Sequence, residues 1–252
     1  MDLLIATLVE RPDLAPLLDR FPADSWPEFM YWDPVAGLHY GHVQQCYAEY
    51  TLVAVDRDQP EAAVAKAYST PFFWEGKLPD AGWDRVVLVA AQDRLLRRTG
   101  NLVAALEITI RPDARGSGLS SIMVDALRRN AARLGHEELV IPVRPSGKHA
   151  EPATPMASYA ARVRADGQPF DPWLRVHARA GGQIGAVAPL SMTIPGTLAK
   201  WREWTGLPFD TTGPVTVPGA LVPVHCDVDA DHAVYVEPNV WVRHPLRSPA
   251  VS

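Results

Sequence analysis

The feature that most constrains the fold is a glycine-rich turn, RGSG at residues 115–118, between an apolar segment and an amphipathic one. Before it, NLVAALEITI (101–110) is an apolar, partly β-branched run that predicts a buried strand. After it, the apolar residues of 117–134 recur every three or four positions, which predicts a helix with one apolar stripe. ELVIPV (138–143) predicts another strand. The run as a whole predicts a βαβ unit, and with it a parallel or mixed sheet in an α/β or α+β fold.

The turn also has the properties of an anion-binding site. The first N–H groups of a helix have no partner within the helix, and the helix dipole favours negative charge at that end. Gly116 and Gly118 carry no Cβ, so the backbone there can approach a bulky diphosphate. Arg111 and Arg115 add positive charge nearby. The alternative is that the glycines serve only a tight strand-to-helix turn.

The spacing around the turn argues against two common nucleotide sites. The dinucleotide fingerprint GxGxxG requires a third glycine where this chain has Ser121. Its ribose-binding acid belongs at the end of the following strand, whereas Glu137 and Glu138 lie before that strand. A Walker loop, GxxxxGK followed by Ser or Thr, is absent. The turn therefore favours a diphosphate ligand other than those of these two sites.

Composition limits the class of protein. The 252 residues fit one large domain, and 47% hydrophobic with 21% charged residues are typical of a soluble globular core. A net charge of −5 argues against a nucleic-acid surface. Two cysteines, Cys46 and Cys226, form neither a disulfide framework nor a CxxC zinc site. The N-terminus lacks a positive n-region, and its apolar stretch ends at Glu10 and Arg11. We expect a cytoplasmic protein with no nucleic-acid and no membrane partner.

Periodicity outlines the remaining elements. Helices are predicted at 11–21, from about Leu38 to 50, and at 83–98, and strands at 51–56 and 61–74. Further on, we expect a helix after an Asp171 N-cap, strands at 183–194 and 214–228, a helix at 197–206, and a β segment at 232–244 broken by Pro238. We expect one domain: an N-terminal half (1–144) containing the βαβ unit (101–143), a mobile loop (145–170) and a C-terminal arm (171–252).

The strand and the turn together resemble the signature of the GNAT superfamily of acyl-CoA-dependent N-acetyltransferases. That signature is Arg/Gln-x-x-Gly-x-Gly/Ala after a strand of the pattern hydrophobic-x-hydrophobic-x-Pro. This chain reads Ile108-Thr109-Ile110-Arg111-Pro112 and then Arg115-Gly116-Ser117-Gly118-Leu119-Ser120, with Ser120 in place of the usual Gly or Ala. The resemblance is specific for 101–143, weaker for 10–75 and slight for 145–252. It implies an α/β (α+β) fold with a mixed, splayed β-sheet flanked by helices, here with an elaborated C-terminal β-rich arm.

The resemblance also implies acetyl-CoA as the co-substrate, with no metal. The N–H groups of Arg115 to Ser120 would hold the pyrophosphate. The pantetheine would enter a V-shaped gap between the strand ending at Ile110 and the strand 139–143. The implied CoA-binding residues are Ile108, Thr109, Ile110, Arg111, Arg115, Gly116, Ser117, Gly118, Leu119 and Ser120.

Proton transfer in the family often uses a Tyr four residues before the Gly of a Y-x-x-x-G-F motif, as donor to the leaving thiolate. The matching stretch here is 177–182, with His177 at the Tyr position and Gly182 in place of the Phe. The resemblance implies His177 as the proton donor, because histidine donates a proton near neutral pH. The alternative is an ordinary helix-surface or interface histidine, and Tyr159 is a reserve candidate.

For the base we consider Glu107, a carboxylate within an otherwise apolar strand. Burial is expected to raise its pKa toward a catalytic range. Strand alternation puts Glu107 on the face opposite Ile108 and Ile110. The alternatives are that it points at a helix or pairs with an arginine, or that water removes the proton.

The expected reaction is acetylation of a small-molecule amine, with the C-terminal arm covering the acceptor cleft. The first-helix aromatic residues Phe29, Tyr31 and Trp32 are candidates to line the acceptor pocket. A protein lysine is a less favoured acceptor. The alternative class is an acyl-CoA-binding protein without amine acetylation: a sensor, a scaffold partner or a decarboxylase-like variant. A homodimer is left open.

A metal site near the C-terminus is not favoured. Candidate ligands cluster there, but their spacing matches no zinc pattern, and a solvated hairpin is the preferred interpretation. These residues are His225, Asp227, Asp229, His232 and the WVRH stretch (241–244).

Overall fold

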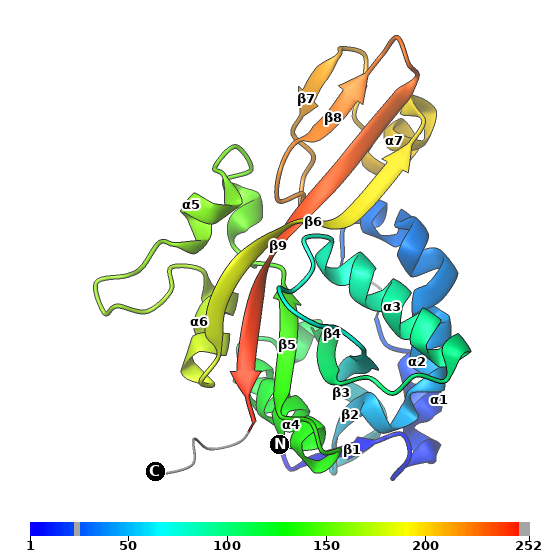
Figure 1. The fold of residues 1–252 in the computed structure, drawn as a ribbon, viewed down its shortest axis with the longest axis vertical. Coiled ribbons are helices and arrows are strands. Elements are labelled where there is room, and N and C mark those ends of the chain that lie inside the picture. Colours follow the sequence, from blue (N-terminus) through cyan, green and yellow to red (C-terminus); the bar gives the residue numbers. More distant parts are fainter. Residues whose placement is uncertain (23–25, 247–252) are drawn as a thin grey trace.

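The computed structural model describes residues 1–22 and 26–246, which form a mixed sheet covered by helices on both faces (Figure 1). The strands are β1 (Leu3–Thr7), β2 (Thr51–Asp56), β3 (Gln59–Phe72), β4 (Leu102–Ile110), β5 (Glu138–Val143), β6 (Gln183–Gly196), β7 (Gly213–Val215), β8 (Val224–Asp227) and β9 (His232–Pro245). Their order is β1-β2-β3-β4-β5-β9-β8-β7, with β6 paired to β9. The predicted mixed α/β architecture is confirmed.

The longer helices lie where helices were predicted, but those in the predicted segments 11–21 and 38–50 are shorter than expected. They are α1 (Ala15–Asp19), α2 (Gly41–Cys46), α3 (Gly82–Leu96), α4 (Leu119–Arg133), α5 (Met156–Ala160), α6 (Pro172–Arg179) and α7 (Leu198–Thr205). Shorter turns precede several of them, including η2 (Glu28–Trp32), η3 (Ala36–Tyr40) and η6 (Lys148–Ala150). The Asp171 side chain accepts from the N–H groups of Trp173 and Leu174, so the predicted N-cap of α6 is confirmed.

The sheet splays between β4 and β5, as predicted. These two strands are parallel and pair only through Val103 with Leu139 and Ala104 with Val140. β5 is paired along its whole length with β9 on its other edge. The C-terminal half of β4 therefore diverges from β5 and leaves a gap between the strands.

A β-bulge in β4 sets which side chains face the gap. Tyr68 of β3 pairs with Glu107 and Ser69 pairs with Ala105, so Leu106 is the extra residue. After the bulge, Ile108 packs on the α4 side of the sheet, whereas Glu107 bonds to Tyr40 on the α3 side. Each face carries its own buried apolar cluster, one built on α4 and the other on α3.

The C-terminal arm differs from the prediction in two places. β9 continues through Pro238, and the expected break there is wrong. The β6–β9 register shifts between Ala188 and Met192, opposite Asn239 and Glu237, so the proline lies in an irregular stretch of the pairing. The predicted strand at 214–228 is also wrong in its middle, because only β7 and β8 at its two ends are extended. The chain between them forms a loop with a left-handed Gly219.

Residues 145–170, expected as a mobile loop, contain η6 and α5 and include buried side chains such as Lys148 and Tyr159. β1, which pairs with β2, was not predicted.

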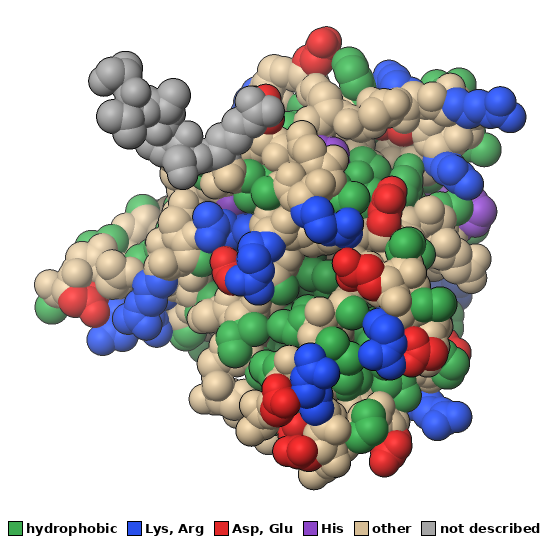
Figure 2. All heavy atoms as spheres, turned by 90° about the horizontal axis from the view of Figure 1, so that it is seen from below, with side chains coloured by type: hydrophobic (Ala, Val, Ile, Leu, Met, Phe, Trp, Pro, Cys, Tyr) green, Lys and Arg blue, Asp and Glu red, His purple; other side chains and the backbone are tan. Residues whose placement is uncertain are grey.

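No helix in the described ranges has the length and apolarity to cross a membrane. Figure 2 shows one face of the molecule, on which Lys and Arg side chains lie beside Asp and Glu side chains.

Candidate active site

A cavity of about 930 Å³ lies where β4 and β5 diverge. One end is lined by Arg115 and Ser120, at the start of α4. Its middle is formed by residues 105–110 of β4 and by 141–144 at the end of β5. Its other end is lined by aromatic residues of the N-terminal segment and of α3, and by polar residues of β9; these are Trp26, Tyr31, Tyr40, Trp83, Glu237 and Asn239.

The α4 end of the cavity fits an anion. Gly116 and Gly118 have φ angles of +79° and +86°, which favour glycine, and a Cβ at either position would meet open space. Gly118 is the N-cap of α4 and supplies no side-chain cap. No described residue accepts a hydrogen bond from the N–H groups of residues 116–120. These donors and the dipole of a 15-residue helix are suited to a diphosphate.

The middle of the cavity fits an extended, amide-bearing chain. Residues Ile108, Thr109 and Ile110 pair with β3 on one edge. Their other edge faces the gap, because β5 pairs with β4 only near Val103 and Ala104. Main-chain groups on that edge are available to a pantetheine arm, as the family resemblance implies. Arg111 pairs with Asp113, and Ser117 Oγ donates to the carbonyl of Ala114, so both side chains already have protein partners.

Glu107 lies on the cavity wall with three partners. Its Oε2 accepts from Tyr40 Oη over 2.8 Å, and its Oε1 accepts from Thr109 Oγ1 over 2.6 Å. Lys66 Nζ lies 3.1 Å from Oε1, and the Glu107 side chain is 11% exposed. The partner is thus a lysine of β3, where an arginine was considered. Burial and the neighbouring Glu107 raise the pKa of Tyr40 well above its usual value, so Tyr40 acts as a donor here.

The other two predicted catalytic residues lie away from the cavity lining. His177 is fully buried, packs against Trp173, and places Nδ1 3.1 Å from Nε2 of His244. Burial, together with His244, lowers the pKa of His177 to about 3, which leaves the ring uncharged at neutral pH. Tyr159 is buried and donates to Asp171 over 3.0 Å. The structure does not bring His177 or Tyr159 to Glu107.

The cavity contains residues that the sequence analysis missed. His149, on η6, lines the cavity, and its Nδ1 lies 2.9 Å from the carbonyl oxygen of Ser146. A carbonyl accepts only, so Nδ1 carries the proton and Nε2 remains available. Lys66, Tyr40 and Glu237 were missed as well, because no local pattern distinguishes them. Of the predicted aromatic residues, Tyr31 lines the cavity, whereas Phe29 lies in the core and Trp32 stacks on Trp204.

Two buried carboxyl groups lie behind the cavity wall. Asp33 accepts from the N–H of Ala36, and Asp84 accepts from the N–H of Thr193. The two carboxyl groups interact with each other. Apart from this mutual interaction, the remaining oxygens, Asp33 Oδ2 and Asp84 Oδ1, are buried and have no protein partner in the described chain. Burial and the neighbouring Asp33 raise the pKa of Asp84 to about 8, and burial raises the pKa of Asp33 as well. The pair therefore retains a proton near neutral pH.

Within the described ranges, no group of three or more His, Cys, Asp or Glu side chains is arranged to hold a metal ion. His225 and His232 belong to the β8–β9 hairpin and are exposed.

The chain was compared with known proteins. It is 34% identical over 271 residues to the arginine N-acetyltransferase avaD of Aspergillus versicolor, covering 96% of this chain and 93% of that protein. Among solved structures, the GphF GNAT-like decarboxylase in complex with isobutyryl-CoA aligns with a TM-score of 0.58 and 18% identity, over 98% of this chain and 100% of that one. The loading GNATL domain of CurA from Lyngbya majuscula aligns with a TM-score of 0.57 and 16% identity, over 97% of each chain.

No protein-family model matches the chain. The two structural alignments support the fold alone, because their sequence identities are low. The curated relative covers nearly the whole chain at a much higher identity, and it is an N-acetyltransferase. Together with the splayed sheet and the RGSG turn at the start of α4, these similarities establish that the chain belongs to the GNAT superfamily of acyl-CoA-dependent N-acetyltransferases.

Proposed function

We propose that the protein transfers the acetyl group of acetyl-CoA to a nitrogen of arginine or of a closely related amino acid. One observation carries the proposal: a single cavity joins the anion-binding turn of α4 to an acceptor end with two Arg/Lys–Glu ion pairs. The curated relative, an arginine N-acetyltransferase, supports the choice of acceptor.

In the reaction, the acceptor nitrogen attacks the thioester carbonyl carbon. A C–N bond forms, the C–S bond breaks, the nitrogen loses a proton and the thiolate gains one. We assign Glu107 as the base, because it is the carboxylate on the β4 wall of the cavity. Tyr40 and Thr109 fix the orientation of this carboxylate.

We assign His149 as the group that supplies a proton to the thiolate. It lies on the β5 side of the cavity, and the Ser146 carbonyl orients its ring by accepting from Nδ1–H. The donating form is the imidazolium, which carries a second proton on Nε2 and gives that proton to the thiolate, leaving the neutral ring protonated on Nδ1. His177 and Tyr159 stay as the sequence-based alternatives for this role, and a pair of variants separates His149 from His177 below.

The test is acetyl-CoA turnover with a panel of amines. Arginine, lysine, ornithine, agmatine and a histone-tail peptide are supplied in turn, and free CoA thiol and acetylated product are both measured. We expect the best turnover with arginine. CoA binding without turnover of any amine would overturn the proposal in favour of an acyl-CoA-binding protein.

A further inference from the structure

Arg144 is held rigidly at the acceptor end of the cavity. It follows the last residue of β5, and its Nε donates to Glu237 Oε2 over 2.9 Å. Its Nη2 donates to the carbonyl oxygen of Gly219 over 2.6 Å, and the guanidinium carbon lies 5.8 Å from the ring centroid of Trp26. Two of the three guanidinium nitrogens are therefore fixed by protein acceptors.

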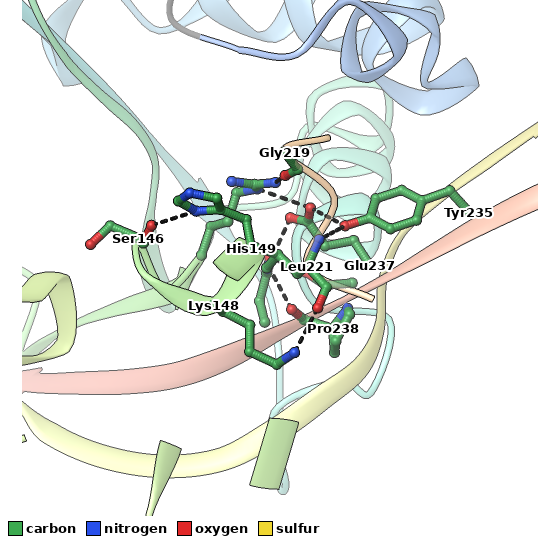
Figure 3. Close-up of polar contacts among 11 residues, drawn as sticks. Ser146, Lys148, His149, Gly219, Leu221, Tyr235, Glu237 and Pro238 are labelled. Carbon is green, nitrogen blue, oxygen red and sulfur yellow. Dashed lines mark hydrogen bonds and ion pairs between the residues drawn. The ribbon is translucent and has the colours of Figure 1, made fainter. Parts of the chain in front are cut away.

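The negative partner of Arg144, Glu237, contributes to the cavity wall, but protein donors occupy its carboxylate oxygens. Glu237 has no exposed surface, and Tyr235 Oη donates to Oε2 over 2.8 Å while Asn239 Nδ2 donates to Oε1 over 3.0 Å. Figure 3 shows Tyr235 directed at Glu237 beside the loop that contains Gly219 and Leu221. Glu237 and Glu107 each have three protein partners, but the Glu237 side chain is 0% exposed whereas that of Glu107 is 11% exposed. Glu237 therefore serves to position Arg144, and Glu107 is the carboxylate that a cationic ligand can reach.

The loop that contacts Arg144 is itself anchored by buried groups. The N–H of Leu221 donates to Tyr235 Oη over 2.8 Å, and its carbonyl oxygen accepts from Lys148 Nζ over 2.7 Å. Lys148 is fully buried, and Nζ also donates to the carbonyl oxygen of Glu151 over 2.6 Å. Such a satisfied buried network fixes the guanidinium before any ligand arrives.

The bonds to Glu237 and Gly219 do not use the third nitrogen of Arg144, Nη1, and Tyr235 Oη is a further neighbour of the guanidinium. Arg144 lines the cavity, and its side chain is 17% exposed. The cavity thus presents a cationic donor at this point and, on the β4 wall, the Glu107 carboxylate with its ion-pair partner Lys66. Opposite charges on two walls are complementary to a zwitterion.

We infer that Arg144 Nη1 binds the carboxylate of an amino-acid acceptor, while the cationic nitrogen of that acceptor faces Glu107. This inference rests on the proposed function and narrows it, because the required acceptor is an amino acid with a free carboxylate. A simple amine, such as agmatine, lacks the group that Arg144 would bind.

The first test uses the unaltered protein. Steady-state kinetics with acetyl-CoA compare arginine with agmatine and with arginine methyl ester, which differ at the carboxylate. A charge-assisted hydrogen bond to a fixed guanidinium predicts a loss of kcat/KM of about 10- to 100-fold for both analogues. Calorimetry of the same ligands in the presence of CoA measures the preference without turnover.

The second test uses Arg144→Gln and the more conservative Arg144→Lys, which keeps a cation beside Glu237. Both variants should reduce the preference for arginine over agmatine to near one and retain the affinity for CoA. Arg243→Gln is the matched control: it removes an ion pair with Glu138 between the same two strands, β9 and β5, outside the cavity lining. It should keep the preference of the unaltered protein.

The outcomes separate the two claims. Equal turnover of arginine and agmatine by the unaltered protein would overturn the Arg144 assignment and leave the proposed function standing. Preferential binding of arginine without turnover would support the assignment and overturn the proposed function. Loss of CoA affinity in the folded Arg144→Lys variant would mean that Arg144 binds CoA, and this result would overturn the inference.

Discussion

At the scale of single residues, the proposed reaction depends on Glu107 as the base that takes the proton of the acceptor nitrogen. Replacing it with glutamine keeps the shape and removes the proton acceptor. We expect Glu107→Gln to lower kcat by about 100-fold, within the usual range for a general base, with little change in CoA affinity. Steady-state kinetics with arginine measure this. Thr109→Val, which removes only one donor to the carboxylate, should have a much smaller effect. Near-normal turnover of Glu107→Gln would mean that water or another group takes the proton.

The proton donor is tested by a pair of histidine variants. We expect His149→Ala to lower kcat by about 100-fold at constant CoA affinity, since it removes the imidazole on the cavity wall. The sequence-based alternative is that His177→Phe has this effect. Turnover, CoA affinity and thermal stability are measured for both variants. Reduced turnover of a stable His177→Phe variant, with normal turnover of His149→Ala, would contradict our assignment.

The Asp33–Asp84 pair predicts a pH dependence of stability. Asp84 has a pKa of about 8 in the folded protein, against 3.8 as its ordinary value, so the folded state holds its proton more tightly than the unfolded state. Folding stability should therefore fall as pH rises from about 4 to about 8, by up to about 1.4 kcal/mol per pH unit.

In Asp84→Asn, the amide replaces the protonated carboxyl and has a donor to offer Asp33. The unfolding free energy of the variant should therefore depend less on pH than that of the unaltered protein. The difference between the two, variant minus unaltered protein, should increase from pH 5 to pH 8. Denaturant melts at several pH values measure the difference. Parallel pH profiles for the two proteins would show that the pair does not hold the proton we assign to it.

At the scale of secondary-structure elements, the turn before α4 is the part that a local pattern identifies. Gly116 and Gly118 lie next to the strand and helix that they connect, so spacing along the sequence reveals them. The same holds for the Asp171 cap of α6. The local sequence also points to Glu107, because it is a single charged residue within an otherwise apolar strand.

Other parts of the site depend on distant residues. Arg144 and Glu237 are 93 positions apart, and Tyr40 and Glu107 are 67 apart. No local pattern predicts such pairs, because the sheet order brings them together. His177 shows what a local motif leaves out: its spacing fits the family pattern, but packing against His244 of β9 determines its burial.

The role of the turn is tested at the two ends of α4. Gly118→Trp puts a bulky side chain over the free N–H groups, and we expect it to abolish measurable CoA binding. Gly135→Trp is the control, because Gly135 has a similar φ of +88° and open space around it at the other end of the helix. Backbone strain should lower the free energy of unfolding of both variants by about 1–2 kcal/mol. Equal CoA affinity in the two folded variants would contradict the diphosphate assignment.

At the scale of the whole molecule, the C-terminal arm is part of the site. The sequence alone predicts that this arm is an elaboration that covers the acceptor cleft. β9 in fact completes the sheet beside β5, and it also supplies Glu237 and Asn239 to the cavity. The acceptor end is therefore built jointly by the N-terminal segment, β4, the end of β5 and the arm, whereas Arg115 and Ser120 at the α4 end come from the βαβ unit.

The central claim is that one cavity joins acetyl-CoA to an amino-acid acceptor. The most direct measurement follows a ¹³C-labelled acetyl group by NMR in a mixture of the protein, labelled acetyl-CoA and arginine. The account predicts that the label moves from the thioester to an amide of arginine, with one free thiol released per amide formed. A label that stays in the thioester while CoA binds would contradict it.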